Sequence, residues 1–282
     1  MTTVLTIDHP AWLKSPSGIH ARAVRSGQGI WVLSWGPGGL NVDCVEGGEG
    51  DKPATETAEP TTLPDSVPGA LRDGLLQLGT AQRLKNPWLW DALTTSILRQ
   101  VVRADQARRL YREWCRAYGQ SVDGPDGWLD IAPDPERVLG LADAEFADIG
   151  AKFHTSVLRS AAEAYLRHAP QWEQLPAKDL AEALTSVPRI GPWTAAATAS
   201  DFTGDFSIYP HSDLAVRTWA QRIAPEYPWP DKKDKAFGPL WLSLAGPAPE
   251  ALHALTLLTL TWGAHAPHVP LLPLNEEEPC RP

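Results

Sequence analysis

Cysteine, long apolar runs and net positive charge are all scarce or missing in this sequence. The three cysteines, Cys44, Cys115 and Cys280, lie far apart and match no metal-binding spacing, so we expect neither disulfides nor an iron–sulfur cluster. No apolar run approaches the length of a membrane span, and residues 1–16 lack the basic start and apolar core of a signal peptide. These absences predict a soluble, cytoplasmic protein without a membrane partner.

The net charge of −9 argues against a nucleic-acid partner, because phosphate contacts are normally made by a basic surface. The acidic residues are unevenly distributed, however. Many fall in a Gly/Thr/Pro-rich stretch at about 46–68 and in a terminal run at 276–278, where we expect a solvated loop and a solvated tail. Residues 83–116 are mostly basic where they are charged, although a solvated helix face would explain such a run equally well. The overall charge therefore leaves a nucleic-acid partner open.

The first part of the chain has the pattern of short β-strands. Strands are expected over residues 3–7, 19–25, 30–35 and 40–45, separated by Gly-rich turns, as in an antiparallel meander. From Leu71 onward the pattern is helical, with a start signal at Asn86-Pro87 and longer helices over 152–168 and 249–262.

Three regions follow from this pattern. They are a small antiparallel β-rich N-terminal domain over 1–70 with the acidic loop at about 46–68, a helical domain over 71–268, and an acidic C-terminal tail over 269–282. The predicted fold class is therefore mostly α, and α+β overall.

Residues 179–217 form the most informative stretch. They are predicted to form a helix, a tight Pro/Gly turn, a second helix, and a short loop that carries Asp213 into a further helix. Unpaired backbone N–H groups at the start of a helix suit a phosphate, and a carboxylate that follows shortly afterwards can lie close to the phosphate's sugar. This arrangement predicts a DNA backbone held beside a catalytic acid.

Residues 187–195, VPRIGPWTA, resemble the hairpin of the helix-hairpin-helix (HhH-GPD) DNA glycosylases, usually written L-P-G-I-G-x-x-T-A. Residues 210–217, PHSDLAVR, are similar to the segment that presents the catalytic aspartate of that family. The branch with the strongest resemblance is the 3-methyladenine DNA glycosylase II type, which also places a β-rich domain ahead of an all-helical core. The resemblance covers roughly residues 84–263. It implies an enzyme of base excision repair that removes damaged, alkylated purines from double-stranded DNA.

Asp213 is the predicted catalytic residue. Cleavage of an N-glycosidic bond builds positive charge on the deoxyribose, and a fixed carboxylate stabilises that charge and can orient or deprotonate the attacking water. An isolated aspartate before a helix is more often a helix cap, but the hairpin upstream favours the catalytic role. Asp201 and Asp205 are rival acids that lie in a Gly-containing connection typical of turns.

Trp193 stands where family members that also cut the DNA strand have a lysine that attacks the sugar. Tryptophan cannot form a Schiff base, so the resemblance implies a monofunctional enzyme without lyase activity. The lack of a four-cysteine cluster also separates this chain from the endonuclease III and adenine-glycosylase branches.

The hairpin residues expected at the DNA backbone are Pro188, Arg189, Ile190, Gly191 and Thr194. Arg189 replaces the first glycine of the family pattern, where glycine permits a positive φ angle. An arginine there can strain the turn or add a charged phosphate contact. Neither a cofactor nor a catalytic metal is expected, although in relatives the hairpin carbonyls can hold a monovalent cation.

A flipped-out base is held by stacking, and a cationic alkylated purine is attracted to electron-rich rings. The candidates for the base pocket are Trp193, Tyr209, Trp90 and Trp262, each with core packing as the alternative. The expected partner is double-stranded DNA with damaged bases, bound by a monomer that is nucleoid-associated if the source is bacterial. Two other functions remain open, namely a non-catalytic helix-hairpin-helix DNA-binding protein and a glycosylase for an oxidised, deaminated or bulky lesion.

Overall fold

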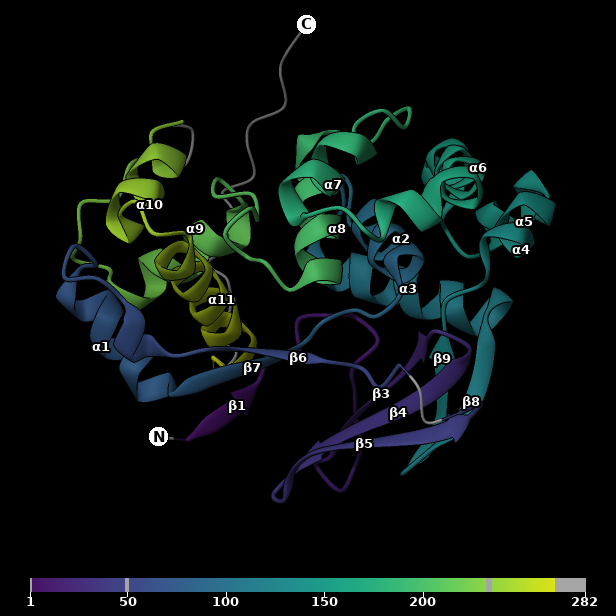
Figure 1. Ribbon diagram of the computed structural model, residues 1–282, viewed down its shortest axis with the longest axis horizontal. Helices are drawn as coiled ribbons and strands as arrows, with labels where there is room; N and C mark the ends of the chain where they lie inside the picture. Colours follow the sequence, from purple (N-terminus) through teal and green to yellow (C-terminus); the bar gives the residue numbers. More distant parts are fainter. Residues whose placement is uncertain (1, 49–50, 232–234, 267–282) are drawn as a thin grey trace, which may run out of the picture.

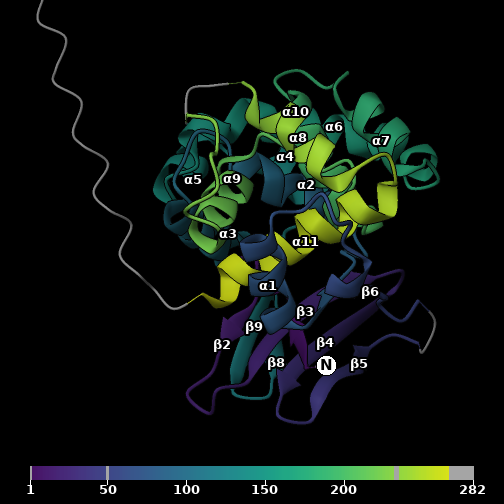
Figure 2. The same ribbon diagram turned by 90° about the vertical axis from the view of Figure 1, so that its left-hand side faces the viewer.

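The computed structural model describes residues 2–48, 51–231 and 235–266. The predicted acidic tail over 269–282 lies outside these residues. Figure 1 shows two groups of helices side by side above the strands, and Figure 2 shows the same two levels from the side. No helix in the described ranges is long and apolar enough to cross a membrane.

Three of the four predicted strands, over 19–25, 30–35 and 40–45, form an antiparallel meander, but the strand expected over 3–7 lies in another sheet and its place is taken by the unpredicted strand β2, in the order β2-β3-β4-β5. The strands of the meander are β2 (Leu13–Lys14), β3 (His20–Ser26), β4 (Gly29–Gly36) and β5 (Gly39–Glu46). Gly27, at a φ of 55°, turns β3 into β4, which is the left-handed conformation that glycine supplies in such hairpins. Alternate residues of β3 and β4 face two different apolar clusters, so the sheet is covered on both sides.

A second sheet has the order β1-β7-β6 and lies between the meander and one group of helices. In it, β1 (Thr3–Leu5) runs parallel to β7 (Thr80–Leu84), and β6 (Thr55–Ala58) pairs antiparallel with β7. The prediction of a solvated loop at 46–68 is therefore wrong for this part of the stretch. Strand β6 contains few apolar residues, and it is held by backbone pairing with β7 and by an ion pair between Glu56 and Lys85. The buried residues Leu63 and Val67 anchor the chain that follows.

The helices divide between two hydrophobic cores. The first core is built from α2 (Leu89–Leu98), α3 (Ala104–Tyr118), α4 (Pro135–Gly140), α5 (Asp143–Asp148), α6 (Thr155–Trp172) and α7 (Ala177–Leu184). The second is built from α1 (Gly69–Leu78), α9 (Leu214–Ile223), α10 (Phe237–Ala245) and α11 (Pro249–His265). Helix α8 (Pro192–Thr203) contributes Ala195 and Ala199 to the first core and Ala197 to the second. It therefore joins the two groups of helices.

The α+β class is confirmed, but the expectation of an all-helical core is not. Strands β8 (Gln120–Gly124) and β9 (Gly127–Ile131) form a hairpin between α3 and α4. This hairpin packs its apolar residues Val122, Leu129 and Ile131 against the inner face of the meander. The helical and β-rich parts are thus interleaved, because strands far apart in sequence share one cluster.

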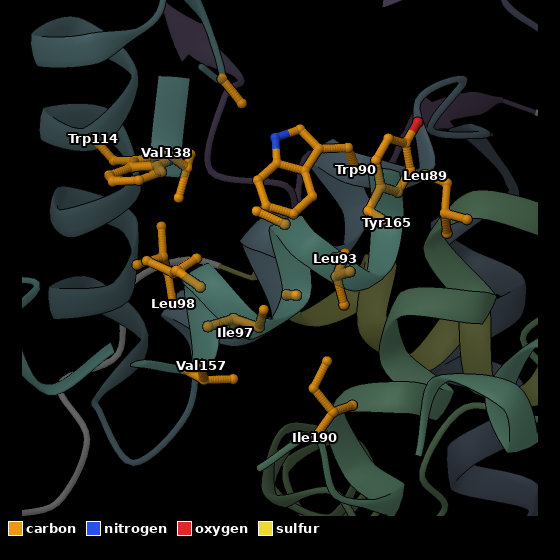
Figure 3. Close-up of a cluster of buried hydrophobic side chains, with 14 of the residues drawn as sticks. Leu89, Trp90, Leu93, Ile97, Leu98, Trp114, Val138, Val157, Tyr165 and Ile190 are labelled. Carbon is orange, nitrogen blue, oxygen red and sulfur yellow. The ribbon is translucent and has the colours of Figure 1, made fainter. Parts of the chain in front are cut away.

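Helix α2 lies at the centre of the first core, and all ten of its residues are buried. Figure 3 shows its apolar side chains meeting Trp114 of α3, Val157 and Tyr165 of α6, and Ile190 of the turn before α8. The end of α2 is therefore fixed in position next to that turn, which matters for the site.

Candidate active site

The turn between α7 and α8, residues 185–191, has the buried and exposed pattern of a surface hairpin. Val187 and Ile190 are buried in the first core, whereas Pro188, Arg189 and Gly191 are exposed. The buried Ile190 side chain therefore anchors the turn in the first core. At Ile190 only the backbone remains available to a ligand. Gly191 has an ordinary φ of −85°, and a side chain added there would meet no atom within 4 Å. The fold does not require glycine at this position, so the bare backbone at the start of α8 is free for a partner to approach.

Arg189 adopts a φ of 68°, in the left-handed region that the glycine of the family pattern would occupy without strain. For an L-residue this conformation costs about 1–2 kcal/mol. Its guanidinium donates to the Ser156 hydroxyl at 2.7 Å and lies 5.5 Å from the centre of the Phe153 ring. The strain expected from Arg189 is confirmed, and a phosphate contact stays a prediction.

Thr194 is buried, and its hydroxyl accepts a hydrogen bond from the Gln100 amide at 2.8 Å. The Thr194 side chain is thus occupied within the protein, and the place of Thr194 in a DNA-contacting hairpin stays a prediction. Gln100 also donates to the carbonyl of Arg189 at 3.4 Å, and its own carbonyl lies 3.4 Å from Nε2 of His154. These contacts tie the turn after α2 to the hairpin.

Asp213 is half-buried and caps the start of α9. Its Oδ1 accepts from the Ala215 backbone N–H at 2.8 Å, and its Oδ2 accepts from the Trp193 indole N–H at 2.6 Å. The capping interpretation and the catalytic one are thus compatible, because two donors fix the carboxylate and leave it partly exposed. Trp193 and Asp213 come from the starts of two successive helices, and the structure brings them into direct contact.

Arg99 and Tyr209 complete this group. The Arg99 guanidinium lies 5.5 Å from the centre of the Trp193 ring, and Arg99 and Tyr209 line the same small cavity. Tyr209 is buried and stacks on Phe206 with ring centres 5.6 Å apart. Burial and the negative charge of Asp213 raise the pKa of Tyr209, so its hydroxyl stays protonated. The sequence did not single out Arg99 as a site residue, because it is only one of several basic residues between positions 83 and 116.

Comparison with protein-family models gives no match for this chain, and comparison with curated protein sequences gives none. Solved structures do match. The 3-methyladenine DNA glycosylase of Archaeoglobus fulgidus has a TM-score of 0.67 at 16% identity, with 90% of each chain covered. This chain has the fold of the helix-hairpin-helix DNA glycosylases.

Two further matches contain DNA. The MBOgg1 structure, in complex with a low-affinity DNA ligand, has a TM-score of 0.67 at 12% identity and covers 90% of this chain and 87% of that one. The 8-oxoguanine glycosylase/lyase of Clostridium acetobutylicum, in complex with double-stranded DNA, has a TM-score of 0.65 at 13% identity and covers 89% of this chain and 86% of that one. The glycosylase fold thus spans nearly the whole length of each chain.

Within this glycosylase fold, Asp201 lies in α8, which corrects the expectation of a turn. Its carboxylate accepts from Arg83 at 2.5 Å and from the Asn86 amide at 2.9 Å. Burial alone would raise the pKa of Asp201, but Arg83, Arg22 and the Asn86 hydrogen bond hold it below its usual value. Asp201 is therefore an ionised, fully partnered acid that fastens α8 to β7. Asp205 is a turn residue as expected, with Oδ1 accepting from the Ser207 backbone at 2.9 Å.

Trp90 and Trp262 are the other two candidates for the base pocket. Trp90 is 0% exposed and donates its indole N–H to the Pro133 carbonyl at 2.7 Å. Figure 3 shows it among the apolar side chains of the first core. Trp90 is thus a core residue, and its assignment to the base pocket is wrong. Trp262 is half-buried on α11, with its ring centre 6.4 Å from that of Trp219 on α9, and stays a candidate.

Val101 is a surface residue just beyond the end of α2. The structure ends α2 at Leu98 and puts Val101 in the turn before α3, 87% exposed and with a φ of 58°. A β-branched residue in this conformation is a true outlier, and a fully exposed valine gains nothing from folding. Its neighbour Gln100 holds it beside the hairpin of the glycosylase fold.

Proposed function

We propose that this protein is a monofunctional DNA glycosylase that hydrolyses the N-glycosidic bond of a damaged base in double-stranded DNA. One observation carries the proposal. The indole of Trp193 donates a hydrogen bond to the Asp213 carboxylate, and Trp193 follows directly after the exposed hairpin, at the position where strand-cutting members of the family have a lysine. The glycosylase fold supports it. All of these residues belong to one chain, so a monomer is sufficient.

The chemistry follows from the geometry of the carboxylate. As the base departs with the bonding electron pair, positive charge develops on the deoxyribose, and the Asp213 carboxylate stabilises it. Hydrogen bonds from Trp193 and Ala215 keep the carboxylate aimed without reorganisation. Water then attacks C1′ of the sugar and gives up a proton to Asp213 or to solvent, which leaves an abasic site. Trp193 has no amine, so no covalent enzyme–DNA intermediate forms.

DNA binding is assigned to the hairpin and the start of α8. The exposed backbone from Pro188 to Gly191 and the positive end of the α8 dipole suit one phosphate group. The side chains of Ile190 and Thr194 are buried and serve to hold this backbone in place. Two carbonyls of the turn already accept hydrogen bonds, from Ile190 and Gln100, and no step above depends on a cation there.

Val101 is assigned as the side chain that fills the gap left by the flipped base. Glycosylases take the target base out of the stack, and an apolar wedge that replaces it offsets part of the cost of unstacking. Exposure, apolar character and backbone strain coincide at Val101, and strain of this kind is concentrated at functional sites.

The resemblance to the 3-methyladenine glycosylase II type makes an alkylated purine one candidate substrate. A neutral oxidised or deaminated base is the second candidate, and the charge of Arg99 over the Trp193 ring favours it.

The decisive experiment measures release of free base from duplexes that carry a panel of alkylated, oxidised and deaminated lesions. We expect Asp213→Asn to lower release by at least about 100-fold while DNA binding persists. Folding should persist too, because asparagine caps a helix as well as aspartate does. Asp205→Asn, at a turn outside the site, is the matched control and should release base at the wild-type rate.

Two results would contradict the proposal. Release from no lesion by the wild-type protein would favour the non-catalytic DNA-binding protein. Trapping of a covalent enzyme–DNA species by borohydride would show a lyase and refute the role given to Trp193.

A further inference from the structure

Arg99 differs from the buried residues Arg22 and Arg83 in having no carboxylate paired directly with it. Arg22 lies 3.0 Å from Asp91, and Arg83 lies 2.5 Å from Asp201. Within the described residues, Arg99 forms no direct ion pair, although the negative charges of Asp213 and Asp8 act on it and raise its pKa. Its guanidinium lies instead over the face of the Trp193 ring, next to Tyr209. A positive charge without a directly paired carboxylate thus lies in the wall of the site.

The position of Arg99 fixes where a base can lie. A cavity of about 10 Å³ behind Arg99 and Tyr209 has room for about one water molecule and is too small for a base. Trp193, Asp213 and Arg99 are each half-buried. A flipped base therefore has to occupy their solvent side, where the Arg99 guanidinium is close to it.

This charge acts in opposite directions on two classes of lesion. The electron-rich face of Trp193 that would attract a cationic alkylated purine is already covered by a cation. Such a purine meets like-charge repulsion on binding, and because it leaves as a neutral molecule, it needs no cation in the transition state. A neutral base takes the electron pair of the broken C1′–N bond and leaves as an anion, which a nearby guanidinium stabilises until solvent supplies a proton.

We propose that Arg99 is a specificity-determining residue that directs the site to neutral purines bearing a carbonyl oxygen, the oxidised or deaminated class, and away from cationic alkylated purines. A guanidinium suits this role because its N–H groups can donate to the carbonyl oxygen where the negative charge of the departing base accumulates. The inference rests on the proposed glycosylase function, since it concerns the leaving group of that reaction.

The test compares single-turnover release of hypoxanthine and 8-oxoguanine with release of 7-methylguanine and 3-methyladenine from matched duplexes. We expect the wild-type protein to prefer the neutral bases. Arg99→Met keeps the length of the side chain without its charge, and should lower release of neutral bases at least tenfold, mainly through the single-turnover rate constant at saturating enzyme, while raising release of the cationic bases. Arg99→Lys keeps the charge and should retain the wild-type order of preference.

Arg103→Met is the matched control, because Arg103 is an exposed arginine of the same turn. If it contacts phosphate, its loss lowers release of both classes alike and leaves their ratio unchanged. Melting curves show whether each variant folds, and Arg99→Gln replaces Arg99→Met if the latter does not.

The outcomes separate the two proposals. Base release with an unchanged ratio in Arg99→Met, or in Arg99→Gln, overturns the role of Arg99 and leaves the glycosylase assignment standing. Release of no base from any duplex by the wild-type protein overturns the glycosylase assignment itself.

Discussion

Replacing Val101 with glycine should make the protein more stable and less active at the same time. The left-handed conformation at a φ of 58° costs a valine about 1–2 kcal/mol, which glycine avoids. Glycine in turn makes the unfolded chain more flexible, at a cost of about 0.4–1 kcal/mol. The side chain is 87% exposed, so few contacts are lost. The net gain is therefore about 0.5–1 kcal/mol.

For a chain of this size, a gain of about 0.5–1 kcal/mol corresponds to a rise in Tm of roughly 1–3 °C. Val101→Ala is the matched variant, because alanine also loses the side chain but keeps the strain. The expected order of stability is Gly above Ala and Val, measured by thermal and urea unfolding. Glycine less stable than alanine would refute the argument from strain.

Activity should follow the opposite order. Burying a valine side chain in a base stack contributes about 1.5–3 kcal/mol, and its loss should slow excision from duplex DNA by about 10- to 100-fold. Single-stranded DNA with the same lesion has no gap to fill, so its excision should change little. Equal effects of Val101→Gly on duplex and single-stranded substrates would show that Val101 is no wedge.

Two other substitutions test the backbone strain and the rival acid. Arg189→Gly should be more stable than Arg189→Ala by about 1 kcal/mol in urea unfolding, the reverse of the order at an ordinary site, and alanine at or above glycine would contradict the strain at Arg189. If Arg189→Gly also leaves the salt dependence of DNA affinity unchanged, the predicted phosphate contact does not exist. Asp201→Asn should cost about 1.5–3 kcal/mol, because it removes the closer of the two carboxylates paired with buried Arg83 and leaves Asp8 at 3.3 Å, whereas Asp213→Asn should cost less than about 1 kcal/mol. If Asp213→Asn were the more destabilising substitution in denaturant unfolding, Asp213 would be the structural acid and Asp201 the candidate for catalysis.

Local signals made part of this structure predictable. The alternation of residues predicted three strands of the meander, β3, β4 and β5, and the hairpin with Asp213 could be recognised because the whole motif lies within about forty residues. Strands β6 and β7 and the hairpin β8–β9 were missed because strand pairing depends on partners distant in sequence more than on composition.

The remaining site residues have no local signature. Arg99, Gln100 and Val101 matter because the end of α2 meets the hairpin, and only the packed core fixes that meeting. A positive φ at Val101 is likewise invisible in the sequence. Trp90 and Trp193 are the same residue type, and only tertiary packing separates the core residue from the one that contacts Asp213.

Helix α8 also sets a dimension of the molecule. It meets both cores through alanines, with Ala195 and Ala199 on one side and Ala197 on the other. The distance between the two groups of helices is therefore set by alanine methyl groups, the smallest side chains apart from glycine's hydrogen atom. A larger side chain at any of these positions would push the two groups of helices apart. It would therefore move the start of α9, with Asp213, away from the turn that carries Arg99 and Val101. The position of Asp213 thus depends on small alanine side chains of α8, all of which are buried.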